Sequence, residues 1–142
     1  MDDVVLAGGR VFNGLLAGTY LAFAIAVMPA LHNQPDDVFV RVMNRISVVI
    51  VNPMFLAIFL GAPIMTAAVA WGQRTPLAFG AFAAALVALL VTVAANVPLN
   101  DALADTGNRD AFETPWLIWH AIRTASATAA FVLLCLGSAG NS

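Results

Sequence analysis

Four side chains able to bind or react lie close together near the start of the last hydrophobic stretch. They are Trp116, Trp119, His120 and Arg123. On an α-helix each residue advances by about 100°, so these four fall within an arc of roughly 100° and share one stripe. Indole rings stack on planar aromatic molecules, and imidazole and guanidinium groups bind their oxygens. The stripe predicts a site for a flat, hydrophobic aromatic ligand.

A second polar group closes the preceding hydrophobic stretch and contains Asn96, Asn100 and Asp101. Because the third stretch ends where the fourth begins, both groups are expected at one end of a helical bundle. Arg123 lies about two turns inside an apolar stretch and needs a partner, for which Asp101 and Asp105 are candidates. The alternative interpretation is structural: an ion pair that joins two helices, and asparagines that cap a broken helix end.

The second hydrophobic stretch contributes Asn52. It precedes Pro53, and Pro53 and Pro63 should each kink a helix that contains them. A kink frees backbone carbonyls, which in lipid must face protein or water, so we expect the Asn52 region to point into the bundle. A kink that only improves packing is the alternative.

Metal and haem binding are disfavoured by the sequence. A metal site would need His32, His120 and a carboxylate such as Asp101, yet the two histidines lack the i, i+4 spacing of helical metal motifs. The single cysteine, Cys135, lies in an apolar run, which excludes an internal disulfide and a multi-cysteine cluster. We therefore expect no metal and no bound cofactor.

The elements that must position these residues are membrane-spanning helices. Of the 142 residues, 61% are hydrophobic and 10% are charged, against about 45–50% and about 25% in soluble domains. Short connections between spans predict an all-α, up-down-up-down bundle of four transmembrane helices in one domain, residues 1–142. Pro115 suits the first position of the last span, with Thr114 as its N-cap. The stretches long enough to cross a bilayer are about 11–31, 43–71, 77–98 and 115–136.

Charge and small residues limit the partners of such a bundle. The chain has six arginines, no lysine and a net charge of −2, which excludes nucleic-acid binding. The expected partners are the lipid bilayer and a hydrophobic aromatic small molecule. Gly14 and Gly18 form a small-xxx-small pair that lets another helix approach closely, and a homo-oligomer could use it. The arginines divide between the two ends of the bundle, so the positive-inside rule assigns no orientation.

Four segments carry a resemblance to the DUF1772 family, also called the anthrone oxygenase-like family. The resemblance covers about residues 10 to 136. It implies a small integral-membrane four-helix bundle, some of whose relatives oxidise anthrones to anthraquinones with dioxygen and no recognised cofactor. The matching segments are Met28-Pro29-Ala30-Leu31, Asn52-Pro53-x-Phe55, Asn96-Val97-Pro98-Leu99-Asn100 and Trp116-x-x-Trp119-x-x-x-Arg123-Thr124.

The resemblance implies roles for the polar residues. An anthrone has an acidic methylene hydrogen, and its removal gives an electron-rich enolate that can pass an electron to dioxygen. His120 would be the base, with Asp101 as its substitute or orienting group. Arg123 would hold the enolate oxygen. The expected substrate-binding side chains are Asn96, Asn100, Trp116, Trp119, Tyr20 and Asn52.

Two other classes of function remain beside a cofactor-independent oxygenase. A small multidrug-type transporter needs a carboxylate within a span, whereas the acidic residues here lie at ends or in loops, which disfavours it. A quinone-binding or assembly subunit would use the same aromatic and arginine stripe only for recognition. Whether the protein is an enzyme is therefore open at the level of sequence.

Overall fold

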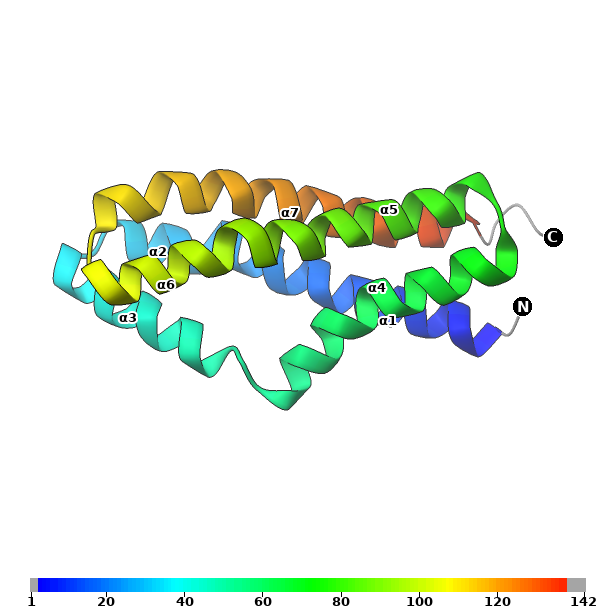
Figure 1. Cartoon of the computed structure of the whole chain (residues 1–142), viewed down its shortest axis with the longest axis horizontal. Coiled ribbons are helices and arrows are strands. Elements are labelled where there is room, and N and C mark those ends of the chain that lie inside the picture. The colour runs from blue at the N-terminus through cyan, green and yellow to red at the C-terminus, as the bar shows by residue number, and fades with distance from the viewer. Residues whose placement is uncertain (1–2, 138–142) are drawn as a thin grey trace.

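The described chain forms four antiparallel helical spans. The computed structural model describes residues 3–137, which are helical apart from short connections. Successive spans run in alternate directions, and α1 begins at the end of the molecule where α7 ends (Figure 1). This confirms the all-α fold with four helices long and apolar enough to cross a membrane. The elements are α1 (Asp3–Ala22), η1 (Phe23–Val27), α2 (Met28–His32), α3 (Asp36–Val49), α4 (Pro53–Gln73), α5 (Pro76–Val91), η2 (Thr92–Asn96), α6 (Val97–Thr106) and α7 (Arg109–Gly137).

The range expected to form one kinked helix, 43–71, is divided between α3 and α4, which meet in a V (Figure 1). Pro53 is the first residue of α4 and has no N–H to donate to the carbonyl of Val49. The Asn52 side-chain amide donates to that carbonyl instead, at 3.0 Å. Its oxygen accepts from the backbone N–H of Phe55 at 2.9 Å. Asn52 is thus the N-cap of α4, and its side chain bonds only to its own neighbourhood.

Replacing Asn52 with alanine should lower the free energy of unfolding by about 1 kcal/mol, the usual cost of losing an N-cap. The replacement also leaves the carbonyl of Val49 without this donor. The measurement is thermal unfolding in detergent. Asn52→Ser, which keeps a good cap, should lose less. The matched control is Asn44→Ala in the middle of α3, where no side-chain hydrogen bond is lost; an equal loss there would contradict the capping role.

The first and third spans pass through short π-helical segments instead of ending. η1 and η2 each stop two residues before a proline, Pro29 and Pro98. A proline inside a helix removes one backbone bond and clashes with the preceding turn, and a π-turn widens the helix at that point. The third span therefore continues past Pro98 to Thr106.

The fourth span begins earlier than expected. α7 starts at Arg109, and the Asn108 side-chain oxygen accepts from the backbone N–H of Ala111 at 3.2 Å. Pro115 therefore lies inside the helix rather than at its first position, and Thr114 is not the N-cap. Because the periodic apolar pattern starts only near Pro115, the polar first turns of α7 gave no signal in hydropathy.

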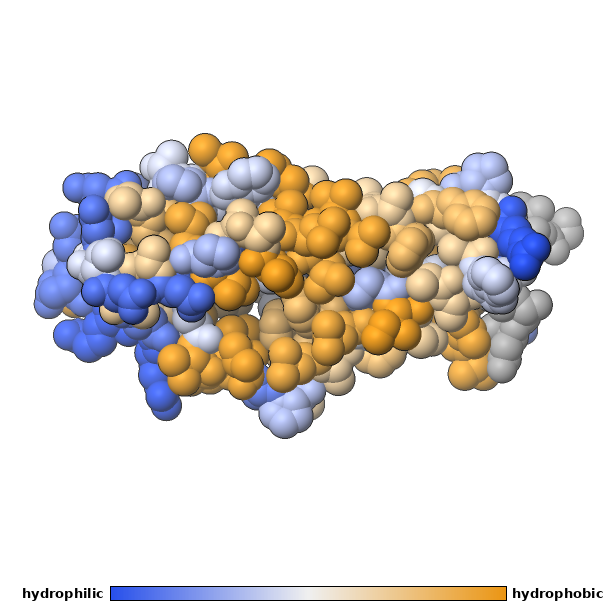
Figure 2. All heavy atoms as spheres, in the orientation of Figure 1, coloured by the Kyte–Doolittle hydropathy of each residue, from blue (hydrophilic) through white to orange (hydrophobic). Residues whose placement is uncertain are grey.

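Polar residues gather at one end of the molecule, and an apolar surface covers much of the face shown in Figure 2. α7 has 29 residues, about 43 Å at roughly 1.5 Å per residue, whereas the hydrocarbon core is about 30 Å thick. The polar end therefore extends beyond the hydrocarbon. There, Arg109 pairs with Asp36 at 3.0 Å and with Glu113 at 2.9 Å. The pair with Asp36 fastens the start of α3 to α7, and the pair with Glu113 lies within α7.

Of the Gly14 and Gly18 pair, only Gly14 packs closely against another helix of the same chain. A Cβ at Gly14 would lie 3.2 Å from the ring of Phe131, so its absence lets α7 approach α1. A Cβ at Gly18 would meet nothing within 4 Å. Close helix packing thus explains Gly14 without a second protomer.

Candidate functional site

Arg123 is buried in the bundle without a carboxylate partner. Its side chain lies on α7 and the residue is 8% exposed. Nε donates to His120 Nδ1 at 3.0 Å and Nη1 donates to Thr92 Oγ1 at 3.2 Å. The guanidinium carbon lies 4.4 Å from the ring centroid of Tyr20. Within residues 3–137 no Asp or Glu pairs with Arg123, so the cation is stabilised by neutral acceptors and aromatic rings alone.

The expected ion pairs between Arg123 and Asp101 or Asp105 are therefore not formed. A buried charge without a counter-ion carries a desolvation cost of several kcal/mol. The cost is reduced when an anionic ligand sits beside the cation. This is the electrostatic character of the site: a fixed positive charge in a largely apolar wall.

His120 is held at both ring nitrogens. A guanidinium N–H can only donate, so Nδ1 accepts from Arg123. Nε2 therefore carries the proton of the neutral ring and donates to the backbone carbonyl of Tyr20 at 2.8 Å. The imidazole also stacks on Trp116, with centroids 4.6 Å apart and planes 13° from parallel. Its residue is 1% exposed, so His120 links α1 to α7 inside the bundle.

Two asparagines of the third span hold Trp116. Asn100 accepts from the indole N–H at 2.9 Å. The Asn96 amide donates to the Trp116 backbone carbonyl at 3.3 Å, and its own side-chain oxygen is buried without a partner among the described residues. Asn100 thus positions the indole ring and Asn96 holds the Trp116 backbone, and only Asn100 reaches the cavity described next.

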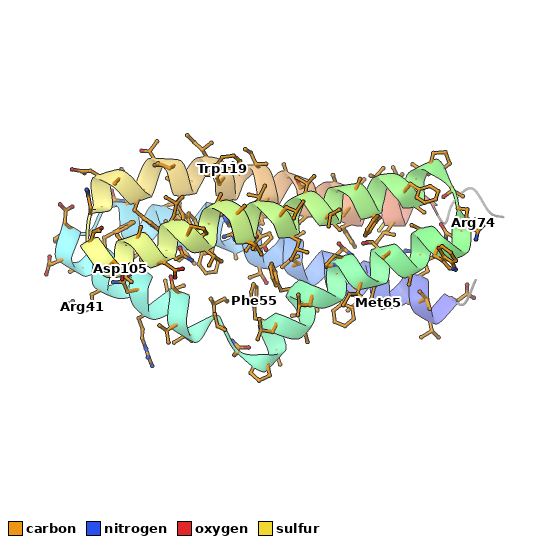
Figure 3. The ribbon with its side chains drawn as sticks, in the orientation of Figure 1. Arg41, Phe55, Met65, Arg74, Asp105 and Trp119 are labelled. Atoms are coloured by element: carbon orange, nitrogen blue, oxygen red, sulfur yellow. The ribbon has the colours of Figure 1, made fainter. Side chains whose placement is uncertain are left out.

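A cavity of about 250 Å³ lies beside this group. The bent α3–α4 pair forms one wall, η2 and α6 form another, and the side chains of Arg123, Trp116 and Tyr20 line its inner side. Phe55 extends from α4 toward the third span (Figure 3) and stacks on Phe59, with centroids 5.7 Å apart. The volume lies just below the roughly 300–1,000 Å³ of typical ligand pockets. It therefore suits a compact aromatic molecule.

The cavity opens toward the region expected to face lipid. Its rim includes exposed apolar side chains on both walls, and Figure 2 shows a narrow opening among apolar side chains. A carboxylate, Asp101, also lines the cavity, near the polar end of the third span. The rim thus gives a hydrophobic molecule a route in from the bilayer. The exposed rim residues are Val51, Leu56, Val93 and Val97.

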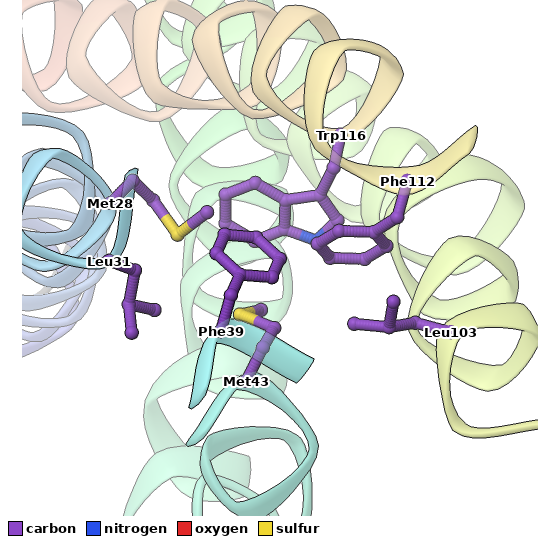
Figure 4. Packing of buried hydrophobic residues seen from close by; sticks show 7 residues of the cluster. All are labelled: Met28, Leu31, Phe39, Met43, Leu103, Phe112 and Trp116. Atoms are coloured by element: carbon purple, nitrogen blue, oxygen red, sulfur yellow. The ribbon is translucent and has the colours of Figure 1, made fainter. Parts of the chain in front are cut away.

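Packed aromatic and aliphatic side chains lie between Trp116 and the polar end. Trp116 packs against Phe112, with ring centroids 6.0 Å apart, and Phe112 packs edge-on against Phe39, also at 6.0 Å. Figure 4 shows this cluster, in which α3 contributes Phe39 and Met43. The cluster fixes the wall of the cavity that carries Trp116.

The structure brings some of the expected site residues together and separates others. Trp116, His120, Arg123 and Tyr20 meet in one group, and Asn100 and Asp101 line the cavity beside it. Trp119 lies at the edge of the shared arc, is 41% exposed, and projects on the outer side of α7 (Figure 3). It does not line the cavity, and neither does Asn52. The predicted stripe is about 100° wide, so helical periodicity alone did not show that a residue at its edge is exposed while those at its centre are buried.

Thr92 is a site residue that sequence reasoning missed. Its hydroxyl lies 3.2 Å from both the Tyr20 hydroxyl and Arg123 Nη1, and it donates to the Ala88 carbonyl at 2.9 Å. Because that donation uses its hydrogen, the oxygen accepts from its other two neighbours. A hydroxyl in the apolar run that begins at Leu77 was the available signal.

His32 lies far from this group, at the polar end. Its Nδ1 is 2.7 Å from a carboxylate oxygen of Glu113, so the two histidines belong to different networks. In the part of the chain that the structure describes, no three His, Cys, Asp or Glu side chains gather as a metal site would require.

The fold and its apolar surface define a multi-pass integral membrane protein with a cavity between its helices. The chain belongs to the anthrone oxygenase family, whose sequence model matches residues 39–133. The match includes α4 to α6 whole and α7 as far as residue 133, whereas Tyr20 lies outside it. No curated protein and no solved structure matches the chain significantly.

Proposed function

We propose that the protein oxidises an anthrone-like polycyclic aromatic to a quinone with dioxygen, in the cavity beside Arg123. The observation that carries this proposal is the buried guanidinium without a carboxylate partner in an aromatic-lined cavity. Two of its five N–H groups are used by His120 and Thr92. Arg123 also interacts with the Tyr20 hydroxyl. The N–H groups beyond these three partners would bind an oxyanion, and a preorganised cation acts strongly in a dry site.

Asp101 is the base in this proposal. It is the carboxylate, among residues 3–137, that lines the cavity, and it does not pair with Arg123. A base and an oxyanion binder must act on different atoms of the substrate, so their separation across a cavity suits the chemistry. His120 is not assigned this role because its Nδ1 lone pair accepts from Arg123 and it does not line the cavity.

The proposed reaction balances without another reductant or oxidant. Asp101 takes one methylene proton, and the resulting enolate passes one electron to dioxygen. The carbon radical and superoxide combine to form a C–O bond, and the protonated Asp101 returns its proton to the peroxide. Loss of the second C–H hydrogen with cleavage of the O–O bond releases water and leaves the new carbonyl. One anthrone and one dioxygen thus give one quinone and one water, with dioxygen as the only co-substrate.

The test is oxidation of anthrone by the purified protein in detergent. Quinone absorbance and oxygen uptake should rise together in a ratio of one to one, above the spontaneous rate measured with heat-inactivated protein. Binding of a hydroxyanthraquinone without any turnover of anthrone would instead support the alternative, a quinone-binding subunit. If the protein neither binds the hydroxyanthraquinone nor oxidises anthrone, both assignments are removed from the cavity.

The rim of the cavity offers a separate prediction. Leu56→Trp should slow ligand binding by about tenfold or more, because the larger side chain narrows an opening that the ligand must pass. The matched control is Met54→Trp, on the same turn of α4, exposed and outside the cavity. The binding rate is measured in liposomes by stopped-flow, as quenching of the protein's tryptophan fluorescence by a hydroxyanthraquinone. Equal slowing by both variants would contradict entry at this rim.

A further inference from the structure

We infer that His120 is a positioning residue that fixes the Arg123 guanidinium toward the cavity and stays a neutral Nε2–H imidazole while doing so. This inference rests on the proposed role of Arg123. The imidazole bridges two spans: Nε2 is 2.8 Å from the Tyr20 carbonyl of α1, and Nδ1 is 3.0 Å from Arg123 Nε on α7. Both nitrogens are therefore occupied by partners that define one tautomer.

Arg123 requires such an anchor because no carboxylate fixes its inner end. Arginine side chains have several flexible bonds, and a carboxylate usually holds the guanidinium in place. Here His120 holds Nε and Thr92 holds Nη1, and no Asp or Glu among residues 3–137 pairs with the Nη2 edge. The guanidinium plane is thereby fixed between the rings of Tyr20 and Trp116, 4.4 and 5.2 Å from the guanidinium carbon. The Nη2 edge can face a ligand in the cavity.

The anchor is itself rigid. The imidazole stacks on Trp116 at 4.6 Å and meets the Tyr20 ring edge-on at 5.7 Å. Trp116 is in turn held by Asn100 and Asn96. Because a hydrogen bond from a charged donor is among the stronger kinds in proteins, losing this one should matter to an oxyanion that binds Arg123.

The tautomer can be tested without replacing His120. Solid-state NMR of ¹⁵N-histidine-labelled protein in bilayers, with His32→Asn used to assign the other histidine, reports which ring nitrogen carries a proton. We expect an unprotonated Nδ1 that accepts a hydrogen bond and a protonated Nε2. A proton on Nδ1, or on both nitrogens, would overturn the inference. This measurement does not depend on any reaction, so it stands even if anthrone is not a substrate.

Two substitutions of His120 test the two ring nitrogens separately. The shorter amide introduced by His120→Asn would place an oxygen near the position of Nδ1, whereas His120→Gln places an amide nitrogen near that of Nε2. Affinity for an anionic hydroxyanthraquinone should stay within about threefold in His120→Asn and fall by about tenfold or more in His120→Gln. Equal losses in both variants would overturn the positioning role. Retained affinity in both with loss of anthrone turnover would do the same, and would point to His120 as the base.

Discussion

Replacing Arg123 with glutamine should lower kcat/KM for anthrone oxidation by about 10²–10³-fold, the usual effect of removing an oxyanion-binding donor, with little loss of thermal stability. The loss of activity follows because the enolate would have no cation beside it. The small effect on stability follows because the guanidinium is buried without a carboxylate. Removing an unpaired buried charge offsets the lost contacts with His120 and Thr92.

Quinone formation and thermal unfolding in the same detergent measure the two effects. The control is Arg45→Gln, an exposed arginine of α3 outside the cavity, which should change neither. Arg123→Lys should be intermediate, since it keeps the charge and loses the planar fork that meets both His120 and Thr92. Parallel losses of stability and activity in Arg123→Gln would mean that Arg123 only joins helices.

Asp101→Asn should lower kcat by about 10²–10⁴-fold, the range expected when a general base is removed. The amide keeps the size of the side chain and cannot accept the methylene proton. Asp105→Asn is the matched control, because Asp105 lies one turn later on α6, is exposed and does not line the cavity. It should leave the rate unchanged.

The two roles can also be separated by the ionisation of the substrate. An anthrone supplied at a pH where it is already an enolate needs no base, so raising the pH should restore much of the activity of Asp101→Asn. It should not restore Arg123→Gln, which lacks the group that binds the enolate. Rescue of both variants, or of neither, would show that Asp101 and Arg123 do not act separately as base and enolate-binding group.

Sequence predicted the fold class because hydropathy reports directly on membrane spans. Four long apolar stretches can bury their backbone polar groups in lipid only as helices or closed barrels. Helical periodicity likewise placed Trp116, His120 and Arg123 on one face, since i, i+4 and i+7 neighbours share a side. Those three side chains meet in the structure.

Other features depend on individual hydrogen bonds, local or long-range, that hydropathy does not report. Residues 43–71 are apolar enough for one long helix, and the division at Asn52 arises from local hydrogen bonds to the Val49 carbonyl and the Phe55 N–H. His120 has partners at both ring nitrogens because Nε2 meets the carbonyl of Tyr20, which is 100 residues away in sequence. No spacing rule within one helix could reveal that contact.

The apolar rim of the cavity determines which ligand concentration sets the occupancy of the site: that in the bilayer or micelle, or that in water. A molecule that enters beside Val51 and Leu56 arrives from the surrounding amphiphile, so occupancy follows its mole fraction in bilayer or micelle instead of its amount per litre of water. Adding empty micelles at constant protein and ligand would therefore dilute the ligand. Apparent affinities from different preparations become comparable only when they are expressed per mole of lipid or detergent.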